Sequence, residues 1–135
     1  MKRLLVFVFS AMALMNSCLA WSAGPSKSKV PMAILIAADW CMNCKVIAPK
    51  LRDALKGLEQ KVSFVNLDVT DDKHFFQSKQ VVFHLGVPKL LQGKISVGWV
   101  ALYDRHGRQV GKLMQDMSVD EMRQAIQQLS SDSAM

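Results

Sequence analysis

Two cysteines separated by two residues are the side chains in this sequence best suited to chemistry. Cys41 and Cys44 follow an apolar run over residues 32–37 and precede a stretch with helical periodicity. A cysteine at the start of a helix lies at the positive end of the helix dipole, which stabilises its thiolate. Such a thiolate can attack a disulfide, and a second thiol one helical turn further on can close back on the first. The spacing therefore predicts a redox-active pair.

Two other interpretations of the pair remain open. A tetrahedral zinc site needs four ligands, and beyond the pair the chain offers only three scattered histidines, His74, His84 and His106. Copper(I) is the more plausible metal, because two thiolates can suffice and Met42 lies between them. An inert disulfide is the third interpretation, but closing so short a loop constrains the unfolded chain very little. We expect no cofactor besides the disulfide itself, with copper on Cys41 and Cys44 as the alternative.

The first 20 residues have the three regions of a secretory signal peptide. Lys2 and Arg3 precede residues 4–15, which are apolar except for Ser10, and small residues precede a cleavage site after Ala20. The apolar run is shorter than the roughly 20 residues that span a bilayer. We therefore expect export with cleavage, and a retained membrane anchor is the alternative.

Cleavage at this site would change both the cysteine count and the charge of the chain. Cys18 would leave with the signal peptide, and the residues before it match a lipidation site poorly. The remaining 115 residues carry 15 Lys and Arg against 11 Asp and Glu, because Lys2 and Arg3 leave as well. These charges are interspersed and form no basic stripe with interleaved aromatics, so we expect no nucleic-acid binding.

The rest of the chain predicts a single domain that alternates strands and helices. Residues 21–30 predict a flexible leader, residues 31–129 the domain, and residues 130–135 a frayed tail. Apolar or alternating runs predict strands over residues 32–37, 62–69, 97–104 and 108–114. Helical periodicity predicts helices over residues 44–58, 71–84 and 118–129, and one further helical turn is expected at residues 89–92. Ser118 and Glu121 have the spacing of a capping box, which fixes the start of the last helix.

Several of these residues resemble the thioredoxin superfamily. The resemblance rests on the run Trp40-Cys41-Met42-Asn43-Cys44-Lys45 with Pro49 behind it, and on the strand and turn over residues 97–107. The segment from Ala38 to Cys41 is most similar to the periplasmic C-terminal domain of the thiol-disulfide interchange protein. The resemblance implies an α/β protein with the minimal thioredoxin fold, β-α-β-α-β-β-α, with a mixed four-stranded sheet and helices on both faces.

The resemblance also implies an activity and roles for individual residues. The protein would be a periplasmic thiol-disulfide oxidoreductase of a Gram-negative bacterium, with Cys41 as an exposed nucleophile and Cys44 as a buried resolving thiol. Trp40 would be an aromatic lid, although a packing role is nearly as well supported. Asp39 would tune the local charge, and Lys45 would add positive charge beside the thiolate or simply be a solvated helix residue.

Two positions depart from the family pattern. Many thioredoxins place a buried acid six residues before the first cysteine, where this chain has Leu35. The proline that normally faces the cysteines in the cis form is replaced by Gly98, and a cis bond before glycine would cost ~2.5 to 4 kcal/mol. We therefore expect a trans bond and a different mode of partner recognition. This loss favours two alternatives, a thioredoxin-like copper-binding or copper-delivery module and a redox-silent interaction domain.

The expected partners are protein thiols or disulfides. No nucleotide-binding fingerprint is present in the sequence, so another membrane or periplasmic protein would have to donate or accept electrons. We expect a monomer. The sequence does not predict whether the pair reduces, forms or rearranges disulfides.

Overall fold

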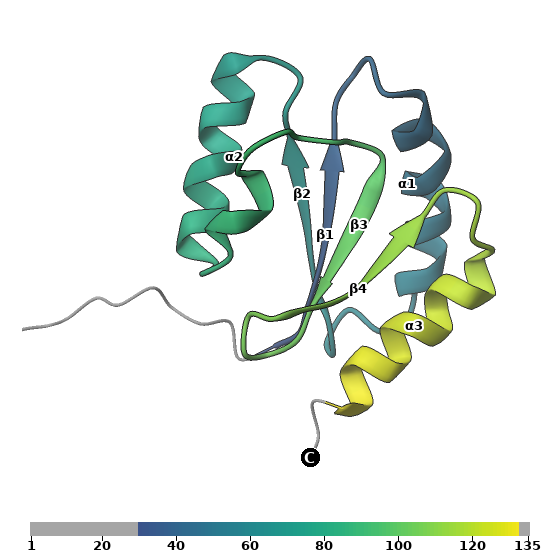
Figure 1. The fold of residues 1–135 in the computed structure, drawn as a ribbon. Coiled ribbons are helices and arrows are strands. Elements are labelled where there is room, and N and C mark those ends of the chain that lie inside the picture. The colour runs from purple at the N-terminus through teal and green to yellow at the C-terminus, as the bar shows by residue number, and fades with distance from the viewer. Residues whose placement is uncertain (1–29, 133–135) are drawn as a thin grey trace, which may run out of the picture.

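The computed structural model describes residues 30–132 (Figure 1). The expected signal peptide, all but the last residue of the expected leader, and residues 133–135 lie outside the described residues. The elements, in chain order, are β1 (Met32–Ala37), α1 (Met42–Leu55), β2 (Ser63–Asp68), α2 (Asp72–His84), the short 3-10 helix η1 (Pro88–Leu91), β3 (Trp99–Tyr103), β4 (Gln109–Met114) and α3 (Val119–Asp132). This order confirms the predicted arrangement of strands and helices.

The four strands form one mixed sheet with the order β2-β1-β3-β4. β1 pairs with β2 in parallel and with β3 antiparallel, and β3 pairs with β4 antiparallel. β1 is therefore a central strand with neighbours on both sides. Its carboxyl end lies beside that of β2, because a right-handed crossover through α1 joins the two parallel strands.

Helices cover both faces of the sheet, with α1 and α3 on one side and α2 on the other (Figure 1). β1 supplies alternate residues to the two cores that result. Ala33 and Leu35 pack with α1 and α3, whereas Ile34 and Ile36 pack with α2 and η1. Both sets are almost fully buried, which explains why this strand is continuously apolar in sequence.

Side chains cap the starts of both α2 and α3. Asp71 is the N-cap of α2 and accepts a hydrogen bond from the backbone N–H of His74. At the start of α3, Glu121 accepts from the N–H of Ser118, whose hydroxyl accepts from the N–H of Glu121. This reciprocal pair is the capping box expected from the spacing.

The end of α3 differs from the prediction. The helix continues to Asp132, so residues 130–132, expected to belong to a frayed tail, are helical. The Ser130 and Ser131 hydroxyls donate to the carbonyl oxygens of Gln127 and Gln128. Serine bonds of this kind are compatible with a helical backbone and do not mark its end. None of the helices within residues 30–132 has the length and hydrophobicity needed to cross a bilayer.

Candidate active site

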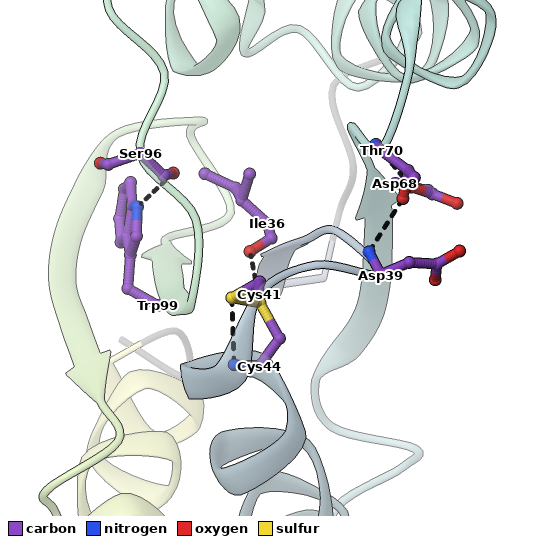
Figure 2. Close-up of a disulfide and its surroundings, with 8 residues drawn as sticks. All are labelled: Ile36, Asp39, Cys41, Cys44, Asp68, Thr70, Ser96 and Trp99. Atoms are coloured by element: carbon purple, nitrogen blue, oxygen red, sulfur yellow. Dashed lines mark hydrogen bonds between the residues drawn. A yellow bond between two sulfur atoms is a disulfide. The ribbon is translucent and has the colours of Figure 1, made fainter.

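A disulfide joins Cys41 to Cys44 at the point where the loop after β1 enters α1 (Figure 2). Cys41 is the N-cap of α1, and its sulfur accepts a hydrogen bond from the backbone N–H of Cys44 at 3.1 Å. The first N–H groups of a helix have no partner within the helix. In the reduced protein, the same N–H and the helix dipole would stabilise a thiolate on Cys41.

Cys41 is buried, which contradicts the expectation of an exposed nucleophile. Only 4% of the Cys41 surface and 6% of the Cys44 surface are accessible to solvent. Val69 and Val97 pack against the cluster that the two cysteines form with Ala38. The backbone at Gly98 passes close to the Cys41 sulfur, since a Cβ on Gly98 would lie 3.2 Å from it. Access to Cys41 therefore depends on the position of the loop that precedes β3.

Gly98 occupies a position that only glycine fits. Its φ is +85°, in the region that side chains strongly disfavour. A Cβ at this position would also lie 2.7 Å from the Cβ of Asn43, closer than two carbon atoms can approach. The Gly98 N–H donates to the carbonyl oxygen of Ile36 at 2.9 Å, which ties the loop to the end of β1. As expected, the bond before Gly98 is trans, and no cis peptide bond occurs within residues 30–132.

The environment of Cys44 is aliphatic. Its sulfur lies 3.8 Å from the carbonyl oxygen of Ile36, which the thiol of the reduced form could use as a hydrogen-bond acceptor. Leu35 is buried in the core shared with α1 and α3, at the position where many thioredoxins have an acid. Ser78 is the only fully buried polar residue in the described part of the chain. No buried carboxylate among these residues is therefore placed to take the proton from Cys44.

Thr70 anchors the loop that carries the first cysteine. Its hydroxyl accepts a hydrogen bond from the N–H of Asp39 at 3.0 Å, and its carbonyl oxygen accepts from the Trp40 indole at 3.2 Å. The hydroxyl in turn donates to the Asp68 carboxylate at 2.6 Å, which also accepts from the Thr70 N–H. These two bonds from Thr70 hold the pKa of Asp68 below its usual value. The network joins the cysteine loop to the end of β2, and the sequence analysis missed it.

Three of the predicted supporting residues lie at the surface. Trp40 is 64% exposed, and its role as a lid stays a prediction. Its side chain lines a shallow groove beside the disulfide, together with Phe75, Ile95 and Val97. Asp39 and Lys45 are both exposed. The Asp39 backbone contributes to the Thr70 network, whereas its carboxylate and the Lys45 ammonium have no assigned role.

Trp99 lies on the side of the disulfide away from Asp39 and Thr70 (Figure 2). Its indole donates to the carbonyl oxygen of Ser96 at 2.9 Å, and its partly buried ring packs against the core on the α2 side. The Lys112 ammonium lies 4.8 Å from the centre of the ring. Trp99 thus stabilises the turn that carries Gly98 across the disulfide.

The copper alternative stays a prediction. Within the described residues, no group of three or more histidine, cysteine, aspartate or glutamate side chains is placed to hold a metal ion. The two sulfurs are bonded to each other here. A two-coordinate copper(I) ion would therefore require the reduced form.

Comparisons with known proteins agree with this geometry. The family model described as Thioredoxin matches residues 19–96, more than half of the chain. Among solved structures, Mycobacterium tuberculosis dsbF is 20% identical with a TM-score of 0.53, and the match covers 77% of this chain and 84% of that one. A thiol:disulfide interchange protein of the thioredoxin family from Chlorobium tepidum is 13% identical, with a TM-score of 0.55 and coverage of 78% and 83%.

Thioredoxin 2 from Pseudomonas aeruginosa, solved in its reduced form, is 17% identical with a TM-score of 0.52, and the match covers 78% of this chain and 84% of that one. At these identities, the solved structures show a shared fold. A search of curated proteins finds no match. The specific similarity to the C-terminal domain of the interchange protein is not confirmed by these comparisons and stays a prediction.

Proposed function

Because the chain belongs to the thioredoxin family and carries Cys41 and Cys44 as a disulfide, it is a thiol-disulfide oxidoreductase, and we propose that it exchanges disulfides with proteins in the periplasm. One hydrogen bond indicates which of the two cysteines is the nucleophile. The Cys44 N–H donates to the Cys41 sulfur at the start of α1. This bond favours a thiolate on Cys41, so Cys41 is the nucleophile and Cys44 the resolving thiol.

The exchange proceeds in two balanced steps. The Cys41 thiolate of the reduced protein attacks one sulfur of a partner disulfide, and the partner's other sulfur leaves as a thiolate that takes up a proton. Cys44 then loses its proton and attacks the Cys41 sulfur, which releases the second partner thiol. The partner disulfide is reduced, the Cys41–Cys44 bond forms, and two electrons have been transferred. The reverse sequence oxidises a dithiol partner.

Because no buried acid in the described part of the chain lies near Cys44, water can accept the proton of Cys44 when this thiol attacks Cys41 in the second step. Cys44 packs in a small cluster with Ala38, Cys41 and neighbouring aliphatic residues, close to the Ile36 carbonyl oxygen. Burial without a positive neighbour favours the neutral thiol, so the proton must pass to the departing partner thiolate or to water entering with the partner. We propose that opening of the loop at Gly98 provides this access, because that loop covers Cys41 in the oxidised form.

The periplasmic location rests on the amino-terminal pattern. Lys2-Arg3, the apolar residues 4–15 and the small residues before position 21 support export. Amino-terminal sequencing of the protein recovered from the periplasm would test this, and we expect it to begin at Trp21. A protein retained in the membrane fraction with Met1 intact would support the anchored alternative.

The partner that renews the pair is proposed to be a membrane or periplasmic redox protein. We base this on the predicted resemblance of the segment from Ala38 to Cys41 to the interchange protein, which would give the protein a place in a relay of disulfides. We propose that the protein acts as a monomer, with other proteins as both substrates and redox partners.

Trapping of mixed disulfides tests the assignment of the two cysteines. The variant Cys44→Ser keeps the nucleophile but lacks the resolving thiol, so it should accumulate partners bonded to Cys41. The matched variant Cys41→Ser should trap few. Partners are counted on non-reducing gels after acid quenching of periplasmic extracts. Equal trapping by both variants would overturn the order, and no trapping by either would argue against exchange with proteins.

A further inference from the structure

Helix α2 presents aromatic side chains on the side that faces away from the sheet. Its inner side carries Ser78 and Val82, which are buried against the sheet. On its outer side, Phe76 is 63% exposed and Phe83 is 62% exposed. The two phenylalanines are seven residues apart, which is two helical turns, so they project from the same side of α2. No other described helix lies on this side of the sheet except the short η1 (Figure 1).

The charged residues that follow Phe76 along this segment all have the same sign, whereas Asp72 lies one helical turn before Phe76 on the same side of α2. Residues 73–103 contain four lysines and no aspartate or glutamate. Two of the lysines, Lys73 and Lys79, are exposed on α2. The acids of α2 are confined to its start, where Asp71 caps the helix and accepts a bond from the His74 ring. Beyond its first residue, the outer side of α2 thus combines exposed aromatic rings with uncompensated positive charge.

Another exposed phenylalanine provides a contrast. Phe64 on β2 is 47% exposed, but it lines a hollow on the opposite side of the sheet. Both Arg52 and Glu59 line the same hollow, so charges of both signs surround it. Phe64 therefore has similar chemistry to Phe76 and Phe83 without the uniform positive charge, and it serves as a matched control.

We propose that the outer side of α2, defined by Lys73, Phe76, Lys79 and Phe83, docks on the surface of an anionic phospholipid bilayer. The two phenyl rings would enter the boundary between headgroups and acyl chains, and the lysines would lie among the phosphates. A bilayer offers apolar depth and uniform negative charge over one surface, which matches both features of this side of the helix. A protein partner would have to offer an apolar pocket and negative charge together in a single patch.

Docking in this way would place the disulfide beside the bilayer. The loop that carries Cys41 is hydrogen-bonded to Thr70, two residues before the start of α2. The pair would then meet redox proteins embedded in the same membrane. The docking surface uses neither cysteine, so it can be tested independently of the proposed exchange activity.

Vesicle sedimentation tests the proposal on residues 21–135. This chain retains every described element and both cores, and it lacks the apolar run at residues 4–15 that would itself enter a bilayer. We expect it to sediment with vesicles of equal phosphatidylglycerol and phosphatidylcholine and to stay in solution with phosphatidylcholine alone. The double variant Phe76→Ser with Phe83→Ser should lower the partition coefficient about tenfold or more, whereas Phe64→Ser should leave it unchanged.

Charge reversal distinguishes a specific effect of the α2 lysines from an effect of the protein's net charge. Lys73→Glu with Lys79→Glu should weaken binding to the anionic vesicles by about tenfold. Lys61→Glu with Arg105→Glu changes the net charge equally at exposed positions outside α2 and should have a smaller effect. Equal losses for the two pairs would show that only overall charge matters and would overturn the assigned surface.

Two other outcomes would also overturn the proposal. One is an absence of binding to anionic vesicles. The other is a concentration-dependent dimer, seen by sedimentation equilibrium, that Phe76→Ser with Phe83→Ser abolishes, because a second copy would then cover this surface. Reduction of a small soluble disulfide should proceed at the wild-type rate in the double variant, which shows that the fold and the proposed exchange activity are intact.

Discussion

Two loops meet at the disulfide, and they are held in place in different ways. The loop after β1 is fixed by hydrogen bonds, since Asp39 and Trp40 both donate to Thr70 and Thr70 donates to Asp68. The loop before β3 is joined to β1 by the bond from the Gly98 N–H to Ile36. Within the loop, the Trp99 indole donates to Ser96, and the approach to Cys41 depends on close packing at Gly98. The first loop positions the nucleophile and the second covers it.

The difference shows how a family site can be rearranged while its chemistry is kept. A hydrogen-bonded loop tolerates changes in shape as long as donors and acceptors remain. A loop in close contact with the sulfur tolerates almost no added volume, because interiors are packed to a density at which one methyl group matters. Replacement of the usual proline by Gly98 thus makes the approach of the backbone to Cys41 depend on the absence of a side chain.

Gly98→Ala should have the largest effect of the substitutions that compare the two loops. The new Cβ would clash with Asn43 and crowd the Cys41 sulfur, and the positive φ adds a backbone penalty. We expect a loss of roughly 2 to 4 kcal/mol in unfolding free energy by urea titration of the oxidised protein. The matched variant is Gly93→Ala, which has a φ of +72° and no atom near the added Cβ. It should lose only about 1 to 2 kcal/mol, and equal losses would refute the close-contact argument.

Asp68→Asn tests the hydrogen-bonded loop through its pH dependence. The Thr70 bonds lower the pKa of Asp68 in the folded protein below the usual value of 3.8. The ionised carboxylate therefore stabilises the fold above that pH, and this contribution is lost as the pH falls through the unfolded and then the folded value. Urea titrations between neutral pH and pH ~3 should show a smaller loss of stability for Asp68→Asn than for the wild type. Parallel curves would contradict the role given to Asp68.

Thr70→Val tests the same loop with a smaller expected effect. It removes the hydroxyl that joins Asp39 to Asp68 and keeps the shape of the side chain. Because the Asp39 N–H can reach water when the hydroxyl is lost, the cost should be about 0.5 to 1.5 kcal/mol. Thr70→Ser should restore most of the stability. If Ser and Val cost the same, the hydroxyl is not what fixes the loop.

Lys45→Gln should have the smallest effect. The ammonium is exposed on α1, so solvent and salt screen its influence on the Cys41 thiolate. We expect the rate of attack on a small disulfide to fall by less than about twofold, with Lys61→Gln as a control for net charge. A tenfold loss that high salt does not reproduce would restore the stronger role that the sequence analysis considered.

The regular elements could be predicted from the sequence because each one follows from local physics. The strand at Met32–Ala37 is bounded as predicted, since a run buried on both faces has no polar position. The capping box at Ser118 and Glu121 depends only on spacing. The position of Gly98 opposite the cysteines was also predicted, by counting back from the turn that follows β3.

Contacts between loops could not be predicted in the same way. The burial of Cys41 depends on how closely the loop before β3 approaches it, which no periodicity encodes. Thr70 lies 31 residues from Asp39, and its only local signal is the spacing from Asp68, which is typical of a side chain that binds nearby backbone. Met114 is 42% exposed, because it belongs to an edge strand and Leu113 occupies the buried face.

The reduction potential of the Cys41–Cys44 pair tests the central claim most directly. Residues 21–135, free of metal, would be equilibrated in glutathione or dithiothreitol buffers and followed by free thiols and tryptophan fluorescence. We predict reversible exchange between disulfide and dithiol with a midpoint between about −270 mV, as in thioredoxin, and about −120 mV, as in a strong oxidant. The position in that range would decide whether the pair reduces or forms disulfides. A pair that stays oxidised or stays reduced throughout this range would contradict the assignment as a redox-active centre.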